Sequence, residues 1–212
     1  MRHIMVLNAK GGSGKTTLAT NLASYLVSQQ NNVTLVDYDP QASSLAWLNE
    51  RSSARPPITG IAGYKSHATR PKRNTDFVIL DVQAAVHGAQ LTTLVRKAQT
   101  ILIPVLPSPI DMRAASRFIK EIKGCAPVAQ KKAKIALVAN RCRSITNISA
   151  ELEEFLSKQK IPFLTTLRDS QNYVRAADRG LGIFELGPAL SAIDREQWLP
   201  ILKWIKSKRS QV

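Results

Sequence analysis

A glycine-rich loop near the N-terminus carries the residues most clearly suited to chemistry. Residues 9–17 read Ala-Lys-Gly-Gly-Ser-Gly-Lys-Thr-Thr and stand between a short apolar run and a helical pattern. Glycines allow the backbone to curl until successive N–H groups point at phosphate oxygens, and the helix N-terminus adds partial positive charge. Lys15 can then reach the β- and γ-phosphates of a nucleotide, and the Thr16 hydroxyl can bind Mg²⁺. The expected phosphate-binding residues are Gly11, Gly12, Ser13, Gly14, Lys15, Thr16 and Thr17.

Polar residues also follow three other short apolar runs. They are Asp37 and Asp39 after residues 33–36, Asp81 after residues 77–80, and Asn140 and Arg141 after residues 135–139. Parallel sheets bind ligands at the carboxyl ends of their strands, so we expect these side chains to gather around the glycine loop. Acidic residues at strand ends can instead cap helices, and an asparagine in a turn can serve local structure alone.

The pattern of the whole chain predicts an α/β fold in a single domain, residues 1–212. Short apolar runs separated by helical patterns indicate a mostly parallel, twisted sheet with helices on both faces. Residues 51–74 are rich in Arg, Pro, Gly and Ser, so we expect a surface excursion there, with a short strand near residues 58–61. The other expected strands are 4–7, 33–36, 77–80, 101–105 and 135–139, and the expected helices are 17–28, 91–99, 112–123, 148–159 and 194–207.

The net charge is strongly positive and is spread along the chain. Thirty Lys and Arg stand against fifteen Asp and Glu, giving +15. Residues 1–100 hold 11 basic and 5 acidic side chains, and residues 101–212 hold 19 and 10. A basic globular protein attracts polyanions, either nucleic acid or an anionic membrane surface. The candidate DNA-binding residues are Arg168, Arg175, Arg179, Lys203 and Lys206, with Lys208 and Arg209 beside them.

The segment Lys-Gly-Gly-Ser-Gly-Lys-Thr-Thr, which starts at Lys10, resembles the deviant Walker A motif of the ParA/MinD family. Residues 36–41 resemble the switch I segment of that family, and residues 78–81 resemble its Walker B strand. Residues 104–111, with Ala114 and Ala115, are similar to a segment of the small plasmid-type ParA proteins. The sequence starts at the strand before the loop, so we expect a protein of this small type. The resemblance implies a P-loop NTPase fold, bound ATP and Mg²⁺, and slow, partner-stimulated ATP hydrolysis.

The resemblance also implies roles for single residues. Lys10 would cross a dimer interface to the partner's nucleotide, which places it with Lys15 and Asp39 in the catalytic machinery. Asp39 would activate the attacking water. Thr16, Asp37 and Asp81 would hold the metal, and Asn140 with Arg141 would bind the nucleotide near its base.

One segment departs from the family pattern. Asp81 is followed by Val-Gln-Ala-Ala, where many relatives carry Pro and Gly within a few residues. This loop usually senses the γ-phosphate, so regulation of hydrolysis is expected to differ. Two roles stay open for Gln83: orienting water or contacting a neighbouring protomer.

The implied function is that of a cytoplasmic, nucleoid-associated partition or positioning ATPase. ATP would close a homodimer, the dimer would bind double-stranded DNA without sequence preference, and a ParB-like adaptor would stimulate hydrolysis. The cargo could be a plasmid, a chromosome or a protein body such as a carboxysome. Two alternatives stay open: a nucleotide-dependent scaffold with negligible turnover, and a MinD-like membrane ATPase anchored by residues 198–209. Against the membrane alternative, Ile201, Leu202 and Ile205 are expected to cover the sheet.

Overall fold

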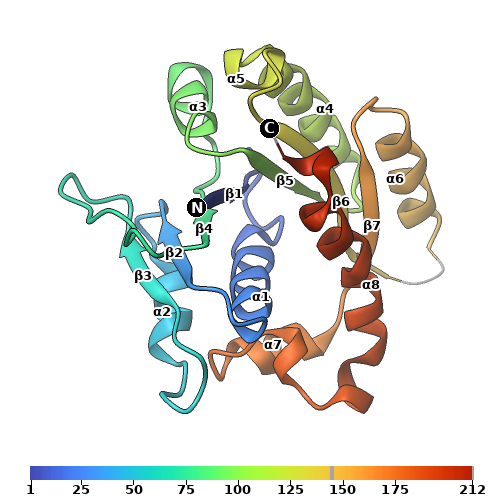
Figure 1. Ribbon diagram of the computed structural model, residues 1–212. Coiled ribbons are helices and arrows are strands. Elements are labelled where there is room, and N and C mark those ends of the chain that lie inside the picture. Colours follow the sequence, from blue (N-terminus) through green and yellow to red (C-terminus); the bar gives the residue numbers. More distant parts are fainter. Residues whose placement is uncertain (144–145, 212) are drawn as a thin grey trace.

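The middle layer of the molecule is a parallel β-sheet (Figure 1). In the computed structural model, which describes residues 1–143 and 146–211, seven strands lie in the order β3-β2-β4-β1-β5-β6-β7. Every neighbouring pair is parallel, so the strands all begin at one edge of the sheet and all end at the other. The strands are β1 Arg2–Val6, β2 Val33–Asp37, β3 Thr59–Ala62, β4 Phe77–Asp81, β5 Thr100–Val105, β6 Lys134–Cys142 and β7 Phe163–Arg168.

Helices cover both faces of the sheet and enclose one apolar cluster on each side (Figure 1). The first face carries α1 Lys15–Ser28, α2 Ser43–Asn49, α7 Gln171–Ala177, the 3-10 turn η1 Ile183–Glu185 and α8 Pro188–Lys206. The second face carries α3 Gly88–Val95, α4 Pro109–Gly124, α5 Ala126–Ala129 and α6 Asn147–Ser157. A second 3-10 turn, η2 Lys208–Ser210, follows α8.

The central strands are buried on both faces, which explains their continuous apolar runs. In β1, Ile4 and Val6 belong to one cluster, while Met5 and the following Leu7 belong to the other. All four side chains are fully buried. Side chains alternate between the two faces of a strand, so a strand covered by helices on both sides needs apolar residues at every position.

Most of the expected elements are confirmed, including the α/β architecture and the short strand in the weak region, which is β3. Besides the two 3-10 turns, the structure adds one strand, β7, and three short helices, α2, α5 and α7, to the expected elements. The helix expected over residues 91–99 lies at Gly88–Val95, because residues 96–99 form the turn into β5. The last helix starts at Pro188, six residues before the expected start, and proline suits the first turn of a helix.

The last helix packs on the sheet, as expected. Trp198, Ile201, Leu202 and Ile205 are at most 4% exposed and belong to the apolar cluster of the first face. These side chains are therefore not free to enter a lipid bilayer. Within the described part of the chain, no helix combines the length and the apolar character that a membrane span requires.

Candidate nucleotide-binding site

The glycine loop joins β1 to α1 and is braced from a neighbouring strand. Gly12 and Gly14 have φ angles of +72° and +88°, which glycine adopts at little cost. The side-chain amide of Asn140, at the end of β6, donates a 2.8 Å hydrogen bond to the carbonyl of Ser13. A Cβ atom at Gly14 would collide with that amide nitrogen. Gly14 thus permits both the backbone turn and the close approach of Asn140.

The two lysines of the loop have different environments. Lys15 is 8% exposed, and its Nζ donates a 3.2 Å hydrogen bond to the carbonyl of Lys10. Burial lowers the pKa of Lys15, while the carboxylates of Asp81 and Asp39 act in the opposite direction. The Lys10 side chain is exposed, in a shallow hollow that His87 also lines. Lys15 therefore faces the protein's own phosphate site, whereas Lys10 lies at the surface beside it.

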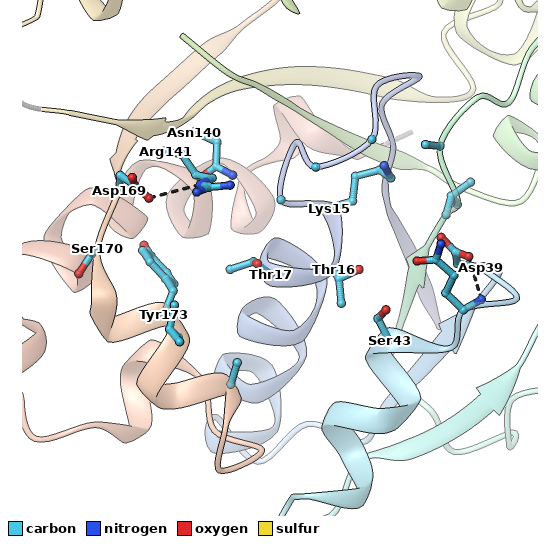
Figure 2. Close-up of a pocket in the computed structure, with 18 of the residues that line it drawn as sticks. Lys15, Thr16, Thr17, Asp39, Ser43, Asn140, Arg141, Asp169, Ser170 and Tyr173 are labelled. Atoms are coloured by element: carbon cyan, nitrogen blue, oxygen red, sulfur yellow. Dashed lines mark hydrogen bonds and ion pairs between the residues drawn. The ribbon is translucent and has the colours of Figure 1, made fainter. Parts of the chain in front are cut away.

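A pocket of about 710 Å³ opens above the loop, at the carboxyl ends of the strands. That volume suits a ligand of nucleotide size. Lys15 and Thr16 lie in the middle of the pocket (Figure 2). Asp39 and Ser43 stand on one side, and Asn140, Arg141, Asp169, Ser170 and Tyr173 on the other. The structure thus brings together residues from five separate segments. Some of them were expected at strand ends, and others had no expected role.

Asp37 and Asp39 have different environments, although only Tyr38 lies between them in the sequence. Asp37 is fully buried, and its Oδ2 accepts hydrogen bonds from the Ser44 amide, the Ser44 hydroxyl and the Leu45 amide in the first turn of α2. Its Oδ1 accepts from the Asp39 amide at 2.9 Å. A metal role for Asp37 stays a prediction; in this structure its carboxylate oxygens accept the hydrogen bonds that start α2 and fix the backbone of Asp39. Asp39 itself lines the pocket.

Asp81 is the acidic residue that best fits a metal ion. It is 2% exposed, and its Oδ2 is buried without a hydrogen-bond partner among the described residues. Burial raises the pKa of Asp81 to about 7, an effect that the Thr16 hydroxyl partly offsets as a hydrogen-bond donor. A buried oxygen without a partner is costly unless a ligand satisfies it. Mg²⁺ bound with a nucleotide takes one or two protein ligands and completes its shell with phosphates and water. Thr16 and Asp81 fit that arrangement.

The far wall of the pocket comes from β7 and α7, which the sequence analysis did not expect. Arg168, expected to bind DNA, instead donates to the buried Asp194 on α8 through Nε and Nη2, at 2.6 and 3.0 Å. Asn172 donates to the same carboxylate at 2.8 Å. Arg168 therefore serves the wall of the pocket. The sequence did hold a signal: Ser170 accepts a hydrogen bond from the Asn172 amide, as an N-cap residue does at the start of a helix.

Comparisons with known proteins agree with this geometry. A model of the CobQ/CobB/MinD/ParA nucleotide-binding domain family matches residues 4–183. The chain belongs to this family. It is 33% identical over 195 residues, 87% of each chain, to the maintenance of carboxysome distribution protein A (McdA) of Halothiobacillus neapolitanus. It is 27% identical over 164 residues, 71% of this chain and 72% of the relative, to Protein ParA of Rhizobium radiobacter.

The same family is visible in the fold. The structure of an ATP complex of a McdA variant from Cyanothece superposes with a TM-score of 0.73, covering 95% of this chain and 96% of the other at 17% identity. At this identity the likeness shows the shared fold. The family match and the McdA relative at 33% identity identify the chain as a ParA-type P-loop ATPase, a nucleotide-binding protein.

The remaining candidate DNA-binding residues of this ParA-type ATPase fall into two groups at opposite edges of the sheet. Arg175 and Arg179 are exposed on and just after α7, beside the nucleotide pocket. Lys203 and Lys206 are exposed at the end of α8, where Lys206 donates a 3.2 Å hydrogen bond to the Tyr25 hydroxyl near the end of α1. The two groups therefore do not form one patch on a single protomer.

The loop after Asp81 is held against the phosphate loop. Ala85 has a φ of +59°, and its amide donates a 2.8 Å hydrogen bond to the carbonyl of Ala9. Val82 and Ala84 line the pocket, while Gln83 is half-buried. The family departure at residues 82–85 thus lies beside the phosphate loop and the pocket of this ParA-type ATPase.

Proposed function

We propose that this ParA-type ATPase closes into a homodimer on ATP, binds double-stranded DNA without sequence preference and positions a cargo. DNA binding would keep the ATPase on the nucleoid, until an adaptor protein stimulates its slow hydrolysis and so releases the dimer. The observation that carries the proposal is the single pocket in which Lys15, Thr16, Asp39 and the neighbouring Asp81 converge. The similarity to McdA, a protein named for maintaining carboxysome distribution, favours a protein body as the cargo.

The residues of the pocket divide the work of phosphoryl transfer to water. Lys15 is positioned to balance the charge of the β- and γ-phosphates, and the loop N–H groups cradle them. Asp39 is partly exposed to the pocket, and its backbone is fixed by Asp37, so its carboxylate can orient and deprotonate the attacking water. Mg²⁺, held by Thr16 and Asp81, would neutralise charge on the phosphates. Asn140 and Arg141 would support the nucleotide near its base.

Lys10 would complete the partner's site in the closed dimer. Its side chain is exposed at the rim of the glycine loop, outside the lining of its own pocket. A second phosphate-facing cation would then be supplied only when two protomers meet, which couples ATP binding to dimerisation.

Lys10→Ala tests this coupling. The variant should bind a non-hydrolysable ATP analogue with near-normal affinity and stay monomeric in light scattering after size exclusion. Its ATP-dependent DNA binding should disappear with the dimer. Arg113→Ala on α4 is an exposed control that should dimerise normally. A Lys10→Ala protein that dimerises as well as the wild type would remove the cross-interface role.

Co-sedimentation separates the proposed function from its membrane alternative. With ATP, the protein should pellet with duplex DNA of any sequence and remain in solution with vesicles of anionic phospholipid. The reverse result would favour a membrane ATPase.

A further inference from the structure

The edge of the sheet at which the strands begin, here called the amino edge, lies opposite the nucleotide pocket. Its turns are joined by backbone hydrogen bonds that run across neighbouring strands. The Arg2 amide donates to the carbonyl of Asp76 at 2.7 Å. The Gln99 amide donates to the carbonyl of His3 at 3.1 Å, and the Lys134 amide donates to the carbonyl of Gln99 at 2.8 Å. Segments far apart in sequence therefore form one continuous surface.

Basic residues occupy most of the turns at the amino edge. The turns that lead into strands β4, β5, β6 and β7 span residues 63–76, 96–99, 130–133 and 158–162, and the C-terminal segment lies beside them. Asp76 is the single acidic residue in these four turns and in residues 207–211. The exposed cations closest to the strand starts are Lys72, Arg73, Arg96, Lys97, Lys131, Lys132 and Lys160, with Lys206, Lys208 and Arg209 from the C-terminal segment.

The C-terminal segment is fixed to this edge. The Thr100 hydroxyl donates to the carbonyl of Ser210 at 2.7 Å, and Arg2 donates to the Ser210 hydroxyl at 2.6 Å. Arg2 also donates to the carbonyl of Ile205. Lys208 is therefore held beside the start of β5 and next to the turn that carries Arg96 and Lys97.

Apart from Lys158, which pairs with Glu154 on α6, most cations of the four turns are not neutralised by an acidic side chain in the described part of the chain. As far as residues 1–143 and 146–211 are described, none of Lys72, Arg73, Arg96, Lys97, Lys131, Lys132 and Lys160 forms an ion pair. Scattered surface lysines are ordinary, but these follow the order of the strands. From β4 to β7 the sheet takes four steps of about 4.8 Å, so the row is about 19 Å long.

We propose that the amino edge is a binding surface for the phosphate backbone of duplex DNA that works without nucleotide. A row of about 19 Å matches the backbone of about six base pairs. Lys and Arg contacts to phosphates suffice for binding without sequence preference. The central strands are five or six residues long, so the amino edge lies about 17–20 Å from the pocket. Bound ATP is therefore not needed to form the amino edge.

Duplex DNA is favoured over a membrane because the amino edge offers few apolar side chains to insert. Among the described residues, the large apolar side chains most exposed elsewhere are Ile110, Val174, Leu190, Ile193 and Leu199, whereas Met1 and Tyr64 are the members of this group in the amino-edge segments. The inference rests on the proposed function for the choice of DNA as the polyanion. The mode of binding is separate, because it requires neither ATP nor a dimer.

Fluorescence anisotropy of a labelled duplex with the nucleotide-free protein tests the proposal, over about 50 to 200 mM salt. The wild type should bind, and log affinity should fall linearly with log salt. The double variants Arg96→Glu/Lys97→Glu and Lys131→Glu/Lys132→Glu should each bind about tenfold more weakly or worse, with a slope flatter by about two. Arg113→Glu/Arg117→Glu on α4 makes the same change of charge away from the row and should bind within about threefold of the wild type. Circular dichroism and urea unfolding of all three variants report whether the fold is intact.

The outcomes keep this inference apart from the proposed function. Nucleotide-free protein that ignores DNA at low salt, or an equal loss in the α4 control, overturns the amino edge. Binding to phosphatidylserine vesicles in preference to DNA overturns the choice of partner. If ATP adds DNA affinity while the nucleotide-free protein has none, the proposed function stands and this inference fails. If the nucleotide-free protein binds DNA and ATP adds no affinity, this inference stands and the ATP-dependent DNA binding of the proposed function fails.

Discussion

The two edges of the sheet treat charge in opposite ways. At the carboxyl edge, cations and carboxylates occur together: Arg168 pairs with the buried Asp194, Arg141 lies 3.3 Å from Asp169, and the buried Asp81 lies near Lys15. At the amino edge, cations line the strand starts, with Asp76 as their acidic neighbour. Buried charges interact strongly at short range, so their interaction energy depends on exact positions. Exposed charges are screened by water and salt, so their effect depends on how many of them lie together. The first arrangement suits one ligand in one pose, and the second suits an extended polyanion.

Lys15→Ala should have the largest effect and should be confined to the carboxyl edge. Loss of the cation that faces the β- and γ-phosphates should weaken ATP binding by about a thousandfold or more. Isothermal titration calorimetry measures this directly. Lys97→Ala removes one cation from the amino edge and should leave ATP affinity unchanged. Equal ATP affinity in the wild type and Lys15→Ala would refute the assignment of the loop.

Asp39→Ala should separate binding from turnover within the pocket. Because the carboxylate acts on water, phosphate release should fall about a hundredfold or more while ATP affinity and dimerisation persist. A phosphate-release assay and light scattering with ATP measure the two properties. Phosphate release at the wild-type rate would take Asp39 out of the mechanism.

Arg168→Ala tests whether this arginine belongs to the pocket wall rather than to a DNA surface. The change leaves the buried Asp194 carboxylate with Asn172 and without its cation, so the free energy of unfolding should fall by about 2–3 kcal/mol. The estimate is below the cost of breaking a fully buried pair, because the Arg168 side chain is 33% exposed. Arg175→Ala, on an exposed residue nearby, should change the free energy of unfolding by less than about 0.5 kcal/mol. Urea unfolding compares the two, and equal stability would contradict the structural role.

Asp81→Asn should reveal how much free energy it costs the protein to bury an acidic group at the carboxyl edge. In the nucleotide-free protein, burial raises the pKa of Asp81 to about 7, so the folded state holds a proton that the unfolded chain releases near pH 4. The free energy of unfolding should therefore decrease as pH rises from about 4 to 7, and this contribution should stay constant above about pH 7. The neutral variant should be more stable than the wild type by about 2 kcal/mol at pH 8, and by clearly less at pH 5. Urea unfolding at the two pH values measures this, and a gain that does not depend on pH would show that Asp81 is not the cause.

The sequence predicted most of the sheet and the phosphate loop because their signals are local. Four apolar residues in a row mark a buried strand, and glycines at fixed spacing mark the loop. By contrast, β7 begins with half-buried residues at the edge of the sheet, so its pattern is weak. The helix α7 has seven residues, which is too short for a clear periodicity.

Roles that depend on distant partners could not be predicted. Whether Asp37 binds a metal or starts a helix depends on the first turn of α2, where Ser44 lies seven residues after Asp37. From the sequence, Arg168 could not be distinguished from an unpaired surface cation, because only the fold places Asp194 beside it. The row at the amino edge joins Arg73, Arg96 and Lys131, residues separated by more than twenty positions each, through the order of the strands alone.

The shared direction of all the strands has a consequence beyond a single protomer. If two protomers close across their nucleotides, as Lys10 would require, their carboxyl edges face each other and their amino edges point apart. Such a dimer is divalent, with one site for DNA at each end. It could tie together two stretches of the same chromosome, and each tie would raise the local concentration of DNA for the next. The number of DNA cross-links would then follow the amount of ATP-bound dimer, and hydrolysis would reduce that number.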